Sequence, residues 1–83
     1  MNNTIKPKEE FFPSELVHGI IRDNKNRLKS FRMYRKLTQA ELSEMSGVEV
    51  SIIGKIEKGE NTTLQNFKAL SKVLNIDIEL LKN

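Results

Sequence analysis

Apolar residues recur every three or four positions along most of this 83-residue chain, which is the spacing of one face of an α-helix. The pattern predicts helices at residues 15–23, 26–36, 38–46 and 49–57, another through Phe67 to Leu74, and a final helical turn at 78–81. No internal repeat or low-complexity tract appears. We therefore expect an all-α domain of five or six helices.

Composition divides the chain into three parts. Residues 1–10 are polar and show no periodicity, so they predict a flexible tail. Residues 11–25 predict an N-terminal helical extension capped by Ser14, and residues 26–83 form the main domain. A chain this short buries only about 60–65% of its unfolded surface, which allows one modest core and disfavours a deep enzyme cleft.

The strongest local signals lie between Thr38 and Gly47. Thr38 and Glu41 have the spacing of a capping box, in which each side chain accepts a hydrogen bond from the other residue's backbone N–H. Gly47 suits the left-handed conformation that ends a helix. Leu42 and Met45 are expected to face the core. The next helix begins at once, so the sequence predicts two short helices joined by a tight turn.

The second of these helices has a buried and an exposed side. Val48, Ile53 and Ile56 are expected to face the core. The other residues of this helix then point away from the core, toward whatever the protein binds: Glu49, Val50, Ser51, Ile52 and Lys55.

Polar residues also mark the ends of the later elements. Thr62 or Thr63 caps the helix that follows, and Thr62 and Gln65 have the spacing of a second capping box. Asn75 is expected to stop that helix in the left-handed conformation, and Asp77 to cap the final turn.

The formal net charge of +3 is unevenly distributed. Seven basic residues and one acidic residue lie between Arg22 and Lys36, whereas five basic residues and seven acidic ones follow Leu37. A basic stretch is the electrostatic footprint of a protein that binds a polyanion. The alternative for any single charge is that it only solvates a helix face.

Other classes of function find no support in the sequence. There is no cysteine, so neither a disulfide framework nor a thiolate zinc site is available, and a reducing cytoplasm suits the chain. The single histidine, His18, has no catalytic constellation beside it, and the carboxylates are scattered. No apolar run approaches membrane-spanning length, and no leader appears. We expect a cytoplasmic protein that is not an enzyme and has no metal, cofactor or membrane partner.

The segment LTQAELSEMSGVEVSIIGKIEKGE resembles the helix-turn-helix of the lambda repressor and Cro family, also called the Xre family. LQNFKALSKVLNI resembles the fourth helix of that family, and the resemblance covers residues 26–83. It implies a compact lambda-repressor-like fold and a transcriptional regulator, acting as a repressor, that binds double-stranded DNA sequence-specifically as a homodimer. The reading helix is then residues 49–57.

The resemblance also implies roles for particular residues. Val50, Ser51 and Lys55 occupy positions that meet base edges, and Lys55 has the chemistry to donate to guanine N7 and O6. Ile52 departs from the family pattern, in which a small or hydroxyl residue is common, and it contacts thymine methyls or the groove wall, or packs on a protein. Gly54, which costs a helix about 1 kcal/mol relative to alanine, indicates close approach by another backbone or by DNA, or else a loose helix.

A second group of residues is assigned to the phosphate backbone or to the scaffold. Gln39 matches a phosphate-binding residue of the family, and the loop after the reading helix supplies Lys58, Asn61 and Thr63 as further phosphate contacts. Two charged residues, Arg32 and Glu57, match a partly buried salt bridge and are therefore expected to be architectural.

A second resemblance involves the N-terminal part of the chain. FPSELVHGIIRDNKNRLKSFRMYRKLTQAEL resembles helix-turn-helix antitoxins, which repress their own operon and neutralise a toxin protein. In that alternative, Phe11, Phe12, Leu16 and Ile20 form the partner interface. The competing interpretation is that these four residues cover the open side of the domain or a dimer partner. The extension is expected to be an addition to the minimal DNA reader; the alternative is that it plugs the core, in which case the domain would unfold without it.

Overall fold

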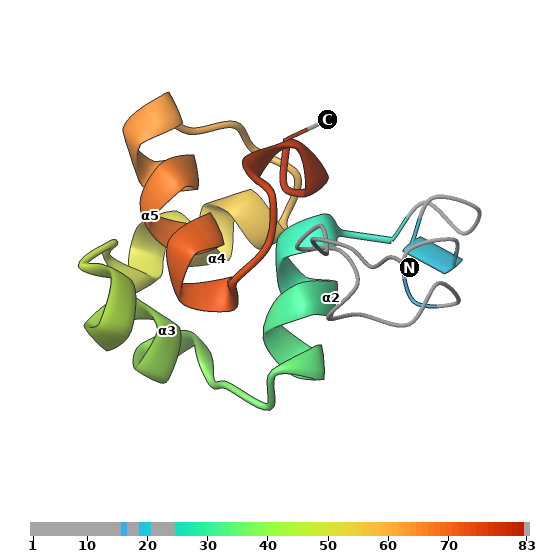
Figure 1. The fold of residues 1–83 in the computed structure, drawn as a ribbon. Helices are drawn as coiled ribbons and strands as arrows, with labels where there is room; N and C mark the ends of the chain where they lie inside the picture. The colour runs from blue at the N-terminus through green and yellow to red at the C-terminus, as the bar shows by residue number, and fades with distance from the viewer. Residues whose placement is uncertain (1–15, 17–18, 21–24, 83) are drawn as a thin grey trace, which may run out of the picture.

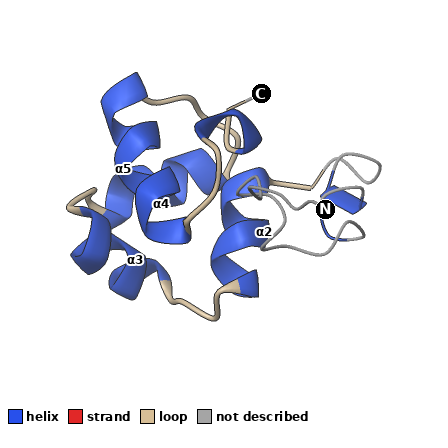
Figure 2. Cartoon of the chain, viewed as in Figure 1, coloured by secondary structure: helices blue, strands red, loops and turns tan. Residues whose placement is uncertain are grey.

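The computed structural model describes Leu16, Gly19, Ile20 and residues 25–82 (Figure 1). Apart from Leu16, Gly19 and Ile20, which are helical, the described residues contain four α-helices, one short 3-10 helix and no strand (Figure 2). These elements are α2 (Arg27–Tyr34), α3 (Gln39–Ser46), α4 (Val50–Glu57), α5 (Leu64–Leu74) and η2 (Ile78–Leu80). The all-α class is therefore confirmed for this part of the chain. The number of helices is not, because the helix expected at 15–23 falls mostly outside the described residues.

The ends of the first helices are set by local hydrogen bonds. Asn26 Oδ1 accepts from the backbone N–H of Lys29 at 2.8 Å and caps α2. The capping box at α3 is present in full: Thr38 Oγ1 accepts from Glu41 N at 3.0 Å, and Glu41 Oε1 accepts from Thr38 N at 2.8 Å. Gly47 ends α3 at φ 79°, in the left-handed region, as the sequence predicted.

The start of α5 differs from the sequence prediction. Thr63 is the N-cap and accepts from Asn66 N at 3.1 Å, while the Asn66 side chain donates to Thr62 Oγ1 at 2.8 Å. The predicted capping box between Thr62 and Gln65 is therefore wrong. The helix begins one residue later than that box requires, so Asn66 occupies the position three residues beyond the cap.

The later caps agree only in part with the sequence prediction. Asn75 ends α5 at φ 58°, as expected. Asp77 occupies the N-cap position of η2 but makes no side-chain capping hydrogen bond. The final turn is a 3-10 helix of three residues.

The core lies between α2, α3, α4 and α5, with η2 against α5. Its buried apolar side chains are Ile20, Leu28, Phe31, Leu42, Val48, Ile53, Ile56, Phe67, Leu70, Leu74, Ile76 and Leu81. Met45 was expected in this core but is 59% exposed. The inward side of α3 is centred between Leu42 and Ser46, and at about 100° per residue Met45 lies off that stripe.

Two residues of the predicted extension belong to the same core. Ile20 is only 4% exposed, and Leu16 packs against the cluster. The carbonyl oxygen of Ile20 also accepts from Lys25 N at 3.0 Å. Apolar surface from the extension is thus buried together with the helices of the main domain.

Polar side chains near both ends of α2 donate hydrogen bonds to backbone carbonyl groups elsewhere in the fold. Asn26 Nδ2 donates to the carbonyl of Ile56 at 2.9 Å, near the end of α4. Arg27 Nη1 donates to the carbonyl of Lys82 at 3.2 Å. Arg35 Nε donates to the carbonyl of Leu74 at 3.1 Å, at the end of α5. The last carbonyls of a helix have no partner inside the helix, so Arg35 supplies a partner for the Leu74 carbonyl at the end of α5.

We predict that Ile20→Ala lowers the free energy of unfolding by about 2–5 kcal/mol, because truncation of a buried isoleucine loses apolar contact and leaves a cavity. Met45→Ala, on the exposed side of α3, is the control and should change stability by less than about 0.5 kcal/mol. Urea denaturation followed by circular dichroism measures both changes. Equal effects of the two substitutions would contradict the burial of Ile20.

Candidate nucleic-acid interface

The outward face of α4 is built by residues one helical turn apart. Val50 is 43% exposed, and Ser51 and Lys55 are exposed, whereas Ile53 and Ile56 are buried on the opposite side. Because residues four apart lie on one face of a helix, Ser51 and Lys55 are neighbours there. The structure therefore brings three of the predicted base-reading residues onto a single surface.

Ile52 lies differently from its neighbours. The sequence predicted that it points away from the core, but it is half-buried and packs against the core cluster. Its position is only one residue, or about 100°, from the fully buried Ile53, which places it at the boundary between the two faces. Only part of its side chain is left at the surface.

The beginning of α4 is acidic. Glu49 occupies the N-cap position with no side-chain capping hydrogen bond. Ser51 Oγ lies 3.5 Å from Glu49 Oε1, at the long limit of a hydrogen bond. A carboxylate near a helix N-terminus stabilises the helix by about 0.3–1 kcal/mol, but it also places negative charge beside Ser51.

Gly54 lies between Ser51 and Lys55 on α4, and nothing among the described residues requires a glycine there. A Cβ atom added at Gly54 would meet no heavy atom within 4 Å, helix neighbours and adjacent residues aside. The first alternative from the sequence, close approach by another part of this backbone, therefore finds no support among the described residues. Because glycine has no side chain, the backbone of α4 is accessible on the exposed face at this point.

The end of α4 is fixed by a buried ion pair. Arg32 Nε donates to Glu57 Oε2 at 2.6 Å, and Arg32 Nη2 donates to Glu57 Oε1 at 3.0 Å. The two side chains are 12% and 6% exposed. Arg32 Nη1 also donates to the carbonyl of Leu37 at 2.7 Å. This is the pair that the resemblance implied, and it joins α2, α4 and the chain that leads into α3.

Electrostatics agrees with this geometry. The hydrogen bonds from Arg32 to Glu57 raise the pKa of the guanidinium above its ordinary value, although burial acts in the opposite direction. The pairing therefore favours the charged form of Arg32, which an arginine side chain keeps in proteins. The two parallel hydrogen bonds are the geometry for which arginine is suited and lysine is not.

Gln39, the predicted phosphate contact, is part of the same network. Its Nε2 donates to Glu57 Oε1 at 3.0 Å, so the first residue of α3 is tied to the last residue of α4. The sequence did not predict this hydrogen bond. Eighteen positions separate the two residues, and no local signal relates them.

The other predicted phosphate contacts lie in the loop from α4 to α5. Lys58 and Asn61 are exposed, and Asn61 Oδ1 accepts from Thr62 N at 2.9 Å. The Thr63 hydroxyl is engaged in capping α5. This loop follows Glu57 directly, so the ion pair fixes the point at which the loop leaves α4.

The basic residues before Leu37 fall into two groups, arginines that hydrogen-bond within the fold and lysines that are exposed. Three arginines, Arg27, Arg32 and Arg35, donate hydrogen bonds to carbonyl oxygens of the fold. Lys25, Lys29 and Lys36 are exposed, and Lys36 adopts a left-handed φ of 59° that its sequence did not signal. Part of the predicted electrostatic footprint is therefore architectural.

The described residues give no sign of another kind of site. Within them, no group of His, Cys, Asp and Glu side chains is arranged to hold a metal ion. No described helix has the length and apolar character needed to span a membrane. His18, Phe11 and Phe12 lie outside the described residues.

Comparison with known proteins agrees with this geometry. A family model described as helix-turn-helix matches residues 28–81, which is well over half of the chain. Neither the comparison with curated proteins nor that with solved structures gave a match.

We predict that Arg32→Met destabilises the fold by about 3–5 kcal/mol, because it leaves the buried Glu57 carboxylate without its cation. The double variant Arg32→Met/Glu57→Leu should lose much less than the sum of the two single changes, since no buried charge is then left alone. Lys29→Met, an exposed position on α2, is the control. Strictly additive losses in urea denaturation would contradict the coupling.

Proposed function

Because the chain belongs to the Cro/C1-type, Xre-like helix-turn-helix family of DNA-binding domains, we propose that it is a sequence-specific transcriptional repressor that reads the major groove with α4. The observation that carries this proposal is the exposed face of α4, held at its end by the buried Arg32–Glu57 pair. The major groove of B-DNA admits an α-helix and shows a distinct pattern of donors, acceptors and methyl groups for every base pair.

Three side chains supply the chemistry for reading bases. The Lys55 ammonium donates to guanine N7 and O6, and the Val50 side chain contacts a thymine methyl. Ser51 serves either as donor or as acceptor and is the least discriminating of the three. The exposed part of Ile52 borders this surface and contacts the groove wall.

Gln39 supplies a phosphate contact whose orientation is set by the scaffold. An amide nitrogen carries two N–H donors, and one of them is directed at Glu57. The second then donates to a phosphate oxygen, so the same carboxylate that holds α4 also orients this donor. Lys58 and Asn61 in the following loop extend the backbone contact, and Thr63 places the N-terminus of α5 beside it.

We further propose that the protein binds as a homodimer on a two-fold operator. A single module of this size buries little surface on DNA, whereas paired reading helices one helical turn apart double the contact.

The described residues do not favour the toxin-binding alternative, because Leu16 and Ile20 pack in or against the core.

Lys55→Ala should leave the fold intact because the side chain is exposed, yet weaken specific binding by about 1–3 kcal/mol and relax preference at one base pair. Gln39→Ala should weaken binding to selected and scrambled duplexes alike, since a phosphate contact carries no sequence information. Fluorescence anisotropy on both duplexes measures the changes, with Lys68→Ala on α5 as the control. An unchanged base preference in Lys55→Ala would remove that residue from the reading role.

Gly54→Ala should act on stability and binding in opposite directions. The substitution fits the free protein and removes the helix penalty of glycine, so the free energy of unfolding should rise by about 0.5–1 kcal/mol. If DNA approaches the backbone of α4 closely at Gly54, the added methyl group weakens binding to the selected duplex. A more stable variant with undiminished affinity would show that Gly54 has no role at the interface.

A further inference from the structure

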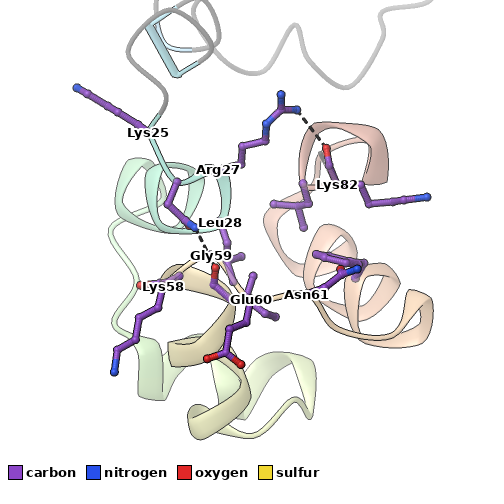
Figure 3. A pocket seen from close by; sticks show the side chains of 13 residues that line it. Lys25, Arg27, Leu28, Lys58, Gly59, Glu60, Asn61 and Lys82 are labelled. Atoms are coloured by element: carbon purple, nitrogen blue, oxygen red, sulfur yellow. Dashed lines mark hydrogen bonds between the residues drawn. The ribbon is translucent and has the colours of Figure 1, made fainter.

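A polar groove of about 560 Å³ opens beside the end of the reading helix. Its walls come from four segments of the chain: the residues around the start of α2, the end of α4 with the loop after it, Phe67 on α5, and the residues after η2 (Figure 3). Six of its lining residues are ionisable, namely Lys25, Arg27, Glu57, Lys58, Glu60 and Lys82.

The charge of this rim is positive where it is accessible. Glu57 is buried and already paired with Arg32, so Glu60 is the acidic group of the rim that remains exposed. In Figure 3, Lys25 and Lys58 lie along the edge of the groove opposite Lys82; Lys25 extends outward before α2 and Lys58 outward from the end of α4, and both are exposed. Lys82 extends the other way, and Arg27 is directed at the carbonyl oxygen of Lys82.

The groove is continuous with the proposed reading surface. Lys58 caps the end of α4 and lies three residues after Lys55, so the two lysines are neighbours on that helix. The other end of the surface is acidic, because Glu49 is exposed at the start of α4. Positive charge near the reading surface is therefore concentrated at the groove end.

We propose that this groove holds the sugar-phosphate backbone of DNA beyond the bases that α4 reads, with Lys25 and Lys58 neutralising successive phosphates. This inference rests on the proposed function. Phosphate neutralisation releases counterions and supplies much of the affinity of such proteins for DNA. The acidic start of α4 cannot supply that contribution, whereas the two exposed lysines of the groove can. Lys25, which lies just before α2, thereby becomes a DNA contact outside the helix-turn-helix.

The test is the salt dependence of binding by Lys25→Ala/Lys58→Ala in the full chain. Each phosphate contact that is lost reduces the slope of log affinity against log salt by about 0.9, so the double variant should lose about 1.8 per bound protomer. Lys68→Ala/Lys72→Ala is the matched control: it removes the same charge from exposed positions on α5, outside the groove. Circular dichroism checks that both variants keep the helical fold.

A slope of Lys25→Ala/Lys58→Ala equal to that of the control overturns the groove proposal, provided that the unmodified protein binds the selected duplex with a steep salt dependence. If the unmodified protein binds no duplex, the proposed function itself fails. Glu60→Gln provides a test of opposite sign. It removes the exposed negative charge from the rim and should raise affinity, and a lowered affinity would also count against the groove.

Discussion

The site depends above all on the buried ion pair between Arg32 and Glu57. A charge removed from water is stable only when it is paired and hydrogen-bonded, so these two side chains admit one relative position of α2 and α4. Arg32 also donates a hydrogen bond to the carbonyl oxygen of Leu37, and Glu57 also accepts a hydrogen bond from the Gln39 side chain. One pair thus fixes the end of α2, the start of α3 and the end of α4, which is the geometry that a protruding reading helix requires.

The basic stretch around α2 shows why arginine and lysine are distributed as they are. Arg27 donates to the carbonyl oxygen of Lys82, and Arg35 donates to that of Leu74 at the end of α5, where helix geometry leaves acceptors without partners. A guanidinium has several donors in a rigid plane and suits such a bridge, whereas an ammonium is a mobile, strongly hydrated point charge. The exposed lysines of the same stretch, such as Lys25, are therefore accessible to a ligand.

The charges along α4 serve the helix and the proposed ligand differently at its two ends. Glu49 at the start favours the positive end of the helix dipole, and Lys55 in the last turn favours the negative end. At the C-terminal end, the cation that stabilises the helix is also the cation that attracts phosphate and guanine. At the N-terminal end the two requirements conflict, because a carboxylate there repels DNA. This asymmetry is one reason for the proposal that the groove next to Lys58 contributes to affinity for DNA.

The sequence by itself determined the ends of α3 and its left-handed stop, because the Thr38 capping box and Gly47 are signals between residues close in the chain. It also implied the family, the exposed face of α4 and the identity of the ion pair. It misplaced Met45, since on a helix of eight residues several apolar stripes are compatible with the spacing and the neighbouring helices select one. Only the tertiary structure decided the partners of Gln39 and Arg27, because those contacts join residues 18 and 55 positions apart, and no local preference encodes them.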